Sequence, residues 1–270
     1  MRGRVLIIAG SDSGGGAGIQ ADIKATTALG AYGATAITAL TAQDTLGVHG
    51  VHAVPLDFIR HQIRLTLADI GADAIKTGML ADAATIGAVC DELEAHPRLP
   101  LVADPVMVAK GGHPLLGEDA VGTLKRRLLP LATVITPNIP EAEVLSGQVI
   151  DGVDTMRAAA SVILALGVPA VLLKGGHLES DTVTDLLATR EGEALFEAPR
   201  IASRHTHGTG CTLASAVAAG LAQGLGLREA VERARAYVRE AIRTAPGFGR
   251  GHGPLNHAVT LDPARLATLS

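Results

Sequence analysis

Short apolar runs alternate with longer amphipathic stretches along most of this chain. The apolar runs have the length of strands, and we expect strands at residues 5–9, 34–42, 74–77, 101–103, 133–136 and 170–173. These runs are continuously apolar, which indicates burial on both faces and a mostly parallel sheet covered by helices. The pattern therefore predicts an α/β fold, a three-layer α/β/α sandwich around one central sheet.

The amphipathic stretches between the runs have the length of helices. We expect helices at residues 19–29, 57–67, 83–94, 119–129, 155–166, 212–223 and 228–243. Several begin after Pro55 or Asp154 and end near Gly30, Gly167 or Gly224, which are typical helix start and stop residues. At 182–187 and 194–196 the pattern shortens and alternates, which predicts antiparallel strands at one edge of the sheet. No repeat, linker or change of composition divides the chain, so we expect a single domain over residues 1–270.

The composition excludes several classes of protein. Only 19% of the 270 residues are charged, 27 acidic and 23 basic, and the formal net charge is -4, which argues against disorder and against an electrostatic nucleic-acid binder. With five aromatic residues and no Trp, the chain is poor material for stacking bases. The first apolar run is too short for a signal peptide, and no apolar stretch reaches the ~20 residues of a membrane span. We therefore expect a cytoplasmic protein, with Cys90 and Cys211 as thiols.

Polar residues follow six of the predicted strands. In a doubly wound sheet, ligands bind beyond the carboxyl ends of the strands. The segments at that position are rich in glycine and in charged or amide side chains, at residues 10–18, 41–44, 76–80, 104–107, 136–141 and 174–177. The sequence predicts that these segments converge on one rim.

The glycine loop at residues 14–18 matches neither common nucleotide-binding pattern. A dinucleotide fingerprint would need glycine where Ile19 stands, and no Gly-Lys-Ser/Thr triplet occurs in the chain. A tight strand-to-helix turn would also explain the loop. With Asp22 shortly after it and Gln43 at the next strand end, a close backbone approach to a small ligand is favoured, because these two side chains can bind amino and hydroxyl groups.

A second glycine-containing segment, at residues 207–212, precedes a helix made of small residues. Gly208, Thr209 and Gly210 leave backbone N–H groups at the helix N-terminus to bind an anion, and the helix dipole favours negative charge there. The same field predicts a lowered pKa for Cys211, as a base or a reactive thiolate. The alternative is that Cys211 is a buried small residue that closes the helix, whereas Cys90 is expected in the core.

Oxygen-bearing side chains stand at two adjacent strand ends. Asp104, Asn138 and Glu141 supply hard oxygen ligands without clustered His or Cys, which suggests Mg²⁺ held largely through waters and phosphates. Alternatively, Glu141 only stabilises the first turn of its helix. Lys174 is positioned to neutralise a transferring phosphate, although a lone lysine at a strand end is more often a solvated charge. The histidines form no metal-binding spacing, and we expect them at the surface or at the substrate rim.

Four segments, at residues 9–22, 136–138, 174–177 and 206–212, closely resemble one family. This is the hydroxymethylpyrimidine/phosphomethylpyrimidine kinase family of the ribokinase-like superfamily, and the resemblance extends over residues 4–258. It implies ATP- and Mg²⁺-dependent phosphorylation of 4-amino-5-hydroxymethyl-2-methylpyrimidine, and then of its monophosphate, at one site. It also implies a homodimer and an open site without a lid domain.

The resemblance assigns roles to residues at matching positions. Gln43 would bind the aminopyrimidine edge and Asp22 the polar side of the substrate. The pocket would be lined by Gly10, Ala17, Met79 and Val106. Lys174, Thr209 and Asn138 would contact ATP, and Asp104 and Glu141 the metal. The catalytic group would be Gly208, Thr209, Gly210, Cys211 and Lys174.

Cys211 stands where many ribokinase-like enzymes have an aspartate base. The base is then a thiolate, or the reaction depends on positioning and charge neutralisation, which phosphoryl transfer tolerates. Three other functions remain open: a pyridoxal kinase, a non-catalytic sensor and a cysteine-nucleophile transferase. Pyridoxal kinases share the fold, although Gln43 and Met79 favour the pyrimidine. A non-catalytic sensor would not need the anion site, and a cysteine-nucleophile transferase would need His207 or His177 as a base.

Overall fold

A computed structural model of the chain describes residues 1–107, 117–262 and 264. Its centre is a nine-stranded sheet in the order β3-β2-β1-β4-β5-β6-β7-β8-β9. The strands are β1 (Arg4–Asp12), β2 (Tyr32–Gln43), β3 (Val48–Ala53), β4 (Ala74–Thr77), β5 (Leu101–Ala103), β6 (Val134–Ile135), β7 (Ala170–Leu173), β8 (Thr182–Thr189) and β9 (Glu193–Pro199). All six strands expected from continuous apolar runs are present, with boundaries shifted by a few residues.

The middle of the sheet is parallel and its edges are antiparallel. β2, β1, β4, β5, β6 and β7 pair in parallel, whereas β3 pairs antiparallel with β2, and β8 and β9 continue the other edge antiparallel. The prediction of an antiparallel edge formed by β8 and β9 is confirmed. β3 was not expected, because none of its residues is buried and its sequence offers no apolar run.

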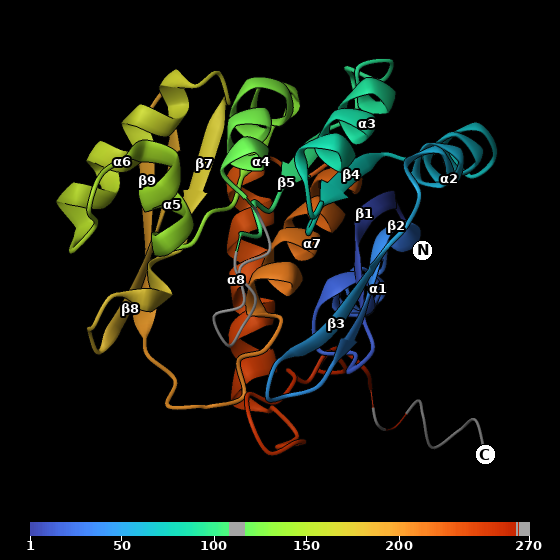
Figure 1. The fold of residues 1–270 in the computed structure, drawn as a ribbon. Helices are drawn as coiled ribbons and strands as arrows, with labels where there is room; N and C mark the ends of the chain where they lie inside the picture. Colours follow the sequence, from blue (N-terminus) through green and yellow to red (C-terminus); the bar gives the residue numbers. More distant parts are fainter. Residues whose placement is uncertain (108–116, 263, 265–270) are drawn as a thin grey trace.

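The helices cover both faces of the sheet (Figure 1). They are α1 (Gly18–Ala28), α2 (Leu56–Asp69), α3 (Ala83–Leu93), α4 (Glu118–Thr123), α5 (Ile139–Ser146), α6 (Val153–Ala165), α7 (Thr209–Ala222) and α8 (Leu227–Arg243). The helix expected at 119–129 is less regular than predicted. It continues from α4 into a π-helical turn at Leu124–Leu128 and a 3-10 turn at Leu129–Leu131, where Pro130 removes a backbone donor.

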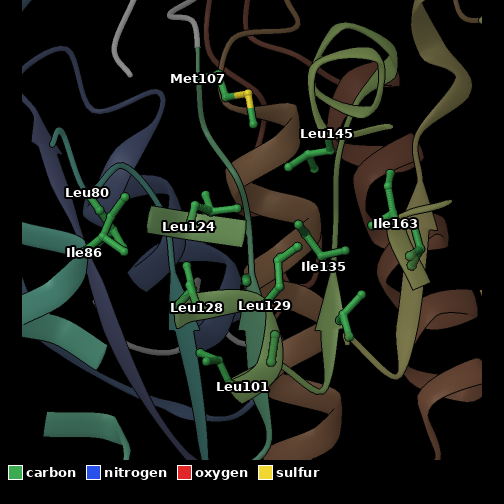
Figure 2. Packing of buried hydrophobic residues seen from close by; sticks show 14 of the residues in the cluster. Leu80, Ile86, Leu101, Met107, Leu124, Leu128, Leu129, Ile135, Leu145 and Ile163 are labelled. Carbon is green, nitrogen blue, oxygen red and sulfur yellow. The ribbon is translucent and has the colours of Figure 1, made fainter. Parts of the chain in front are cut away.

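Two hydrophobic clusters lie on opposite faces of the sheet. Residues from α2 to α6 pack against one face, and residues from α1, α7 and α8 pack against the other. β1 serves both clusters, because Leu6 and Ile8 belong to the first and Val5 and Ile7 to the second. Figure 2 shows the first cluster, in which the labelled Leu, Ile and Met side chains point toward one another. The predicted three-layer α/β/α architecture is confirmed.

Small residues place α7 close to its neighbours. Every residue from Thr212 to Gly220 is buried, and a Cβ on Gly220 would lie 2.7 Å from Ala230 Cβ of α8. Close packing of this kind requires side chains no larger than those present. It holds α7 firmly against the sheet, with its N-terminus near the carboxyl ends of the parallel strands. No helix in the described ranges is both long enough and apolar enough to span a membrane.

Candidate active site

One large cavity, of about 680 Å³, lies at the carboxyl ends of the parallel strands. Almost all the residues assigned a role from the sequence line it: Gly10, Ala17, Gln43, Met79, Asp104, Val106, Asn138, Glu141, Lys174, Gly208, Thr209, Gly210 and Cys211. The structure therefore brings together residues from β1 to the start of α7. Asp22 is the exception among the assigned residues.

Asp12, at the end of β1, organises the glycine loop. Its carboxylate accepts bonds from the N–H groups of Gly14, Gly16 and Ala17, at 2.8–3.0 Å, and His207 Nε2 lies 3.0 Å from Oδ2. Burial opposes the charge, but these donors hold the pKa of Asp12 below its ordinary value. No role for Asp12 was derived from the sequence, although an aspartate directly before a glycine-rich turn is a known signal for such bonds.

The substrate end of the cavity combines an amide with an apolar wall. Thr41 and His207 flank the Gln43 amide, and the Gln43 Nε2 to His207 Nε2 distance is 3.3 Å. A Cβ on Gly10 would collide with Met79 Cε, so glycine is needed for Met79 to lie against β1. His207 was expected at the surface or rim, and it lines the cavity but is only 7% exposed.

The N-terminus of α7 forms another wall of the cavity. Gly208 caps the helix in the left-handed region, with φ 80°, and a Cβ there would collide with Gly16 O. The two glycine segments therefore meet backbone to backbone. Because α7 begins at Thr209 rather than at residue 212, Gly210 and Cys211 lie in its first turn, where backbone N–H groups lack partners within the helix. This is the geometry of an anion site.

Lys174 and Asp104 form an ion pair directly below this first turn. Lys174 Nζ lies 3.1 Å from Asp104 Oδ1, which also accepts a bond of 2.9 Å from Thr136 Oγ1. A Cβ on Gly210 would lie 3.1 Å from Lys174 Nζ and 3.7 Å from Asp104 Oδ2. Burial opposes both charges, but mutual attraction raises the pKa of Lys174 and lowers that of Asp104. Both groups are therefore ionised at neutral pH.

Asn138 and Glu141 form a capping box at the start of α5. Asn138 Oδ1 accepts from the Glu141 N–H at 2.9 Å, and Glu141 Oε2 accepts from the Asn138 N–H at 2.8 Å. Glu141 therefore stabilises the first turn of α5, as the alternative interpretation predicted, and it also lines the cavity. Burial raises the pKa of Glu141 to about 7, against the attraction of Lys174.

The residues assigned to the metal suit Mg²⁺ only as a partial ligand set. In the described ranges no three His, Cys, Asp or Glu side chains form a group that could hold a metal ion. Asp104 and Glu141 nevertheless both face the cavity and offer hard oxygen atoms, and Asp104 Oδ2 lies on the Gly210 side. This donor set fits an ion that takes its other ligands from phosphates and water.

Asp22 lies beneath the cavity rather than in it. Its carboxylate is 0% exposed, accepts two bonds of 2.9 Å from Lys76 Nζ, and accepts a third of 2.7 Å from Ser215 Oγ. The prediction that Asp22 contacts the substrate is therefore wrong for this structure, because its carboxylate is fully buried and does not line the cavity. Lys76 was given no role from the sequence, although a lysine inside an otherwise apolar strand signals a buried counter-ion.

The expected lowering of the Cys211 pKa is also wrong. Burial raises the pKa of this thiol to about 12, and the carboxylates of Asp22 and Asp104 raise it further against the attraction of Lys76. The helix N-terminus does not overcome this desolvation. Cys211 is thus a neutral thiol at pH 7, whereas Cys90 lies in the core as predicted, and both are free cysteines.

The far end of the cavity was not assigned from the sequence. It is lined by apolar side chains of β8 and α8, including Val183 and Val238, and by three arginines, Arg200, Arg235 and Arg239. Arg235 Nε donates to Asp185 Oδ2 at 2.7 Å. This end has both apolar surface and positive charge, which is the chemistry that an aromatic ring linked to phosphates requires.

Several known proteins are similar to this chain. A family profile described as phosphomethylpyrimidine kinase matches residues 12–256. A thiamine biosynthesis bifunctional protein, ThiED, from Geobacter sulfurreducens is 53% identical over 264 residues, and the match spans 98% of this chain and 54% of that protein. A hydroxymethylpyrimidine/phosphomethylpyrimidine kinase from Streptomyces coelicolor is 49% identical over 257 residues, 95% of each chain. The ADP complex of Bacillus subtilis pyridoxal kinase has a TM-score of 0.91 at 39% identity and covers 97% of this chain and 100% of that one.

Proposed function

The chain belongs to the phosphomethylpyrimidine kinase family, and from this premise we propose that it phosphorylates 4-amino-5-hydroxymethyl-2-methylpyrimidine and then the resulting monophosphate, with ATP as donor. It is a phosphotransferase, and the product of both steps, the pyrimidine pyrophosphate, serves thiamine biosynthesis. The ADP bound to the Bacillus subtilis pyridoxal kinase supports ATP as the second substrate.

The observation that carries this proposal is the position of Lys174 and Asp104 under the first turn of α7. The cavity joins this charged centre to the Gln43 end on one side and to the arginine-lined end on the other. A hydroxymethyl group bound near Gln43 and a nucleotide bound near Arg235 would thus meet at Lys174. Such positioning with charge neutralisation supplies most of the catalysis in phosphoryl transfer.

In the proposed reaction the substrate hydroxyl oxygen forms a bond to the γ-phosphorus of ATP, and the bond from that phosphorus to the leaving ADP oxygen breaks. Lys174 and the backbone N–H groups at Gly210 and Cys211 bind the oxygens of the transferring group. The hydroxyl proton passes to an oxygen of the transferred phosphoryl group, because Cys211 is a neutral thiol and cannot accept it. Positioning is then the main contribution of Cys211.

We further propose that Asp104 and Glu141 would hold Mg²⁺ when ATP is bound. When bound, the ion supplies charge neutralisation on those phosphates. Lys174 keeps Asp104 ionised and so preserves the hard ligand that the ion needs.

A second candidate activity is phosphorylation of pyridoxal. It is favoured by one observation, the close match of the whole fold to a pyridoxal kinase. Both activities use the same charged centre and differ only at the Gln43 end of the cavity.

A time course followed by ³¹P NMR tests the proposal. The enzyme is mixed with Mg·ATP and the hydroxymethylpyrimidine, with pyridoxal in a parallel tube and Lys174→Met as the inactive control. We expect a monophosphate and then a pyrophosphate on the pyrimidine. Phosphate transfer to pyridoxal alone would favour the second candidate, and no transfer to either compound would refute both.

Three properties of the chain remain predictions within this proposal. They are a single ribokinase-like domain over residues 1–270 without a lid, a homodimer, and a cytoplasmic location. Sedimentation equilibrium of the full chain tests the homodimer, for which we expect a mass of twice 27.5 kDa.

A further inference from the structure

The Gln43 amide lies between two polar side chains at the substrate end of the cavity. Gln43 Oε1 is 3.1 Å from Thr41 Oγ1, and Gln43 Nε2 is 3.3 Å from His207 Nε2. A rotation of the amide by 180° exchanges its oxygen and nitrogen without moving the rest of the side chain. Which orientation is stable therefore depends on the protons that Thr41 and His207 carry.

The contact with Asp12 fixes the proton of His207. His207 Nε2 lies 3.0 Å from Asp12 Oδ2, and Asp12 is ionised because its pKa is lowered. Nε2 must then carry a proton, since a bare nitrogen would set its lone pair against the carboxylate. An Nε2–H group cannot accept a bond from the Gln43 NH₂ group, because two donors would face each other. It can share its proton with an amide oxygen.

Thr41, on the other side of the Gln43 amide, favours the same amide orientation. Its hydroxyl has one proton, and Thr41 Oγ1 lies 2.9 Å from the carbonyl oxygen of Ser11, which can only accept. When this proton is donated to Ser11, Thr41 Oγ1 can only accept a bond from Gln43. The amide nitrogen satisfies that requirement and the amide oxygen does not.

We propose that His207, held by Asp12, and Thr41 act as positioning residues that turn the Gln43 amide so that Oε1 faces His207 and Nε2 faces Thr41, and that this orientation sets the direction in which the pyrimidine ring binds. The proposal rests on the proposed function, in which Gln43 binds the aminopyrimidine edge. After each amide atom has bound its protein partner, Nε2 has one proton left and Oε1 has one lone pair left. These match a ring nitrogen and an exocyclic amino group on adjacent atoms.

The fixed amide determines where the reacting group points. In the substrate, ring nitrogen N3, the C4 carbon with its amino group and the C5 carbon with its hydroxymethyl group follow one another. With Nε2 near Thr41 and Oε1 near His207, this order runs from Thr41 toward His207. The hydroxymethyl group then lies on the side of Gly208, where α7 begins. The opposite amide orientation would direct it away from Lys174 and the anion site.

The same arrangement discriminates between ring types. Pyridoxal has no amino group next to a ring nitrogen. Its adjacent C3 hydroxyl and C4 aldehyde can pair with Oε1 and Nε2, but its C5 hydroxymethyl group then lies on the Thr41 side, away from Lys174. A freely rotating amide would adapt to either ring, whereas the fixed one pairs fully with pyridoxal only when the reacting hydroxymethyl group points away from Lys174. His207 and Thr41 are therefore specificity determinants for the pyrimidine.

Steady-state kinetics on the full chain test this inference. His207→Leu and Thr41→Val each remove one partner of the amide, and His61→Leu, an exposed position on α2, is the matched control. We expect kcat/KM for the hydroxymethylpyrimidine to fall about 10- to 100-fold in the first two variants, with the KM for ATP unchanged. Activity on pyridoxal should fall less. Equal losses on both rings would overturn the inference.

A double-mutant cycle separates positioning from a direct role. If His207 acts through Gln43, then His207→Leu should cause no further loss in a Gln43→Ala background. Multiplicative losses would show that His207 acts independently, and the inference would fail while the proposed function remained. If the wild-type chain phosphorylates no pyrimidine, it is the proposed function that fails.

The ¹⁵N NMR spectrum of the wild-type enzyme tests the proton arrangement without any loss of folding. The His207 signals are assigned by their absence from the His207→Leu spectrum. In the neutral ring we expect the proton on Nε2, which faces Asp12, rather than on Nδ1. The tautomer with the proton on Nδ1 would overturn the inference whatever the kinetics show.

Discussion

Two lysine–aspartate pairs lie near the carboxyl ends of the parallel strands, and both lysines line the cavity, but the pairs differ in exposure and in how completely their charges are bonded. Lys76 and Asp22 are 2.9 Å apart with both side chains 0% exposed. Lys174 and Asp104 are 3.1 Å apart, and the Lys174 side chain is 13% exposed. In each pair burial opposes the charge of the lysine, and the aspartate raises its pKa above the ordinary value. The carboxyl groups differ, because burial raises the pKa of Asp22 whereas the attraction of Lys174 and Lys76 lowers that of Asp104.

The difference lies in how completely each charge is bound. Both oxygens of Asp22 accept bonds from Lys76, and Ser215 donates a third bond. Lys174, by contrast, bonds to only one oxygen of Asp104 and lies beside Gly210 at the anion site. A pair of charges whose bonds are all made inside the protein stabilises one arrangement of the chain, whereas an incompletely bonded charge beside an anion site can bind a ligand. The same pair of residue types therefore has a structural role in one place and a chemical role in the other.

Removing Asp22 should give the largest effect. Asp22→Ala leaves the Lys76 ammonium buried without its counter-ion, and we expect the free energy of unfolding to fall by about 3–5 kcal/mol. Urea unfolding measures this change. As a control, Asp22→Leu combined with Lys76→Met removes both charges and should recover most of the loss. An Asp22→Ala variant as stable as the wild type would contradict the structural role of the Lys76–Asp22 pair.

Lys174→Met should affect catalysis far more than folding. We expect kcat to fall about 100- to 1,000-fold, because a group that binds the transferring phosphate is lost. The free energy of unfolding should fall less than in Asp22→Ala, because Asp104 keeps the hydrogen bond from Thr136 and the attraction of Lys76. Kinetics and urea unfolding of the same preparation check both parts. A variant with normal kcat would remove Lys174 from the proposed centre.

These two pairs also show what sequence could and could not predict. Lys174 was identified because the carboxyl ends of parallel strands meet at one rim, and this rule also placed Gln43, Asp104 and Glu141 correctly at the cavity. Asp22 was misplaced, because its position early in a helix does not reveal which face of that helix is buried. The pKa of Cys211 was also misjudged, since a helix N-terminus can be recognised in the sequence but its desolvation cannot.

Other parts of the site depend on contacts between distant segments. The bond between Asp12 and His207 spans 195 residues, and no local pattern indicates it. The fold was easier to predict, because continuous apolar runs directly record burial on both faces. β3 was not predicted, because an exposed edge strand has no continuous apolar run in its sequence.

A buried histidine offers a third case of a polar group sealed near the cavity. Burial lowers the pKa of His257 from 6.5 to about 4, and its Nε2 lies 2.9 Å from Thr212 Oγ1 in α7. Because the unfolded chain binds this proton more readily, stability should fall as the pH drops from about 6.5 to about 4, by at most about 3 kcal/mol. Urea unfolding at several pH values measures the slope, and His257→Gln should reduce it. An unchanged slope in the variant would assign the effect to other groups.

Cys211→Ala should give the smallest effect. A thiol whose pKa is raised to about 12 is not a base at neutral pH, so we expect kcat to stay within about 10-fold of the wild type. Cys211→Asp would place a carboxylate near Asp104 and test whether a stronger base helps. A loss of kcat in Cys211→Ala as large as that in Lys174→Met would show that the thiol is essential for catalysis.

The backbone contact between Gly208 and Gly16 has a consequence for how the protein is made. The glycine loop leaves the ribosome before the segment that completes its side of the cavity, which follows about 190 residues later along the chain. Contacts of such long sequence separation form late in folding, because closing the intervening chain costs entropy. The nascent chain therefore holds an incomplete site until α7 has been synthesised. Nucleotide binding can stabilise the molecule only after α7 has joined the sheet, so the ligand favours chains that include α7.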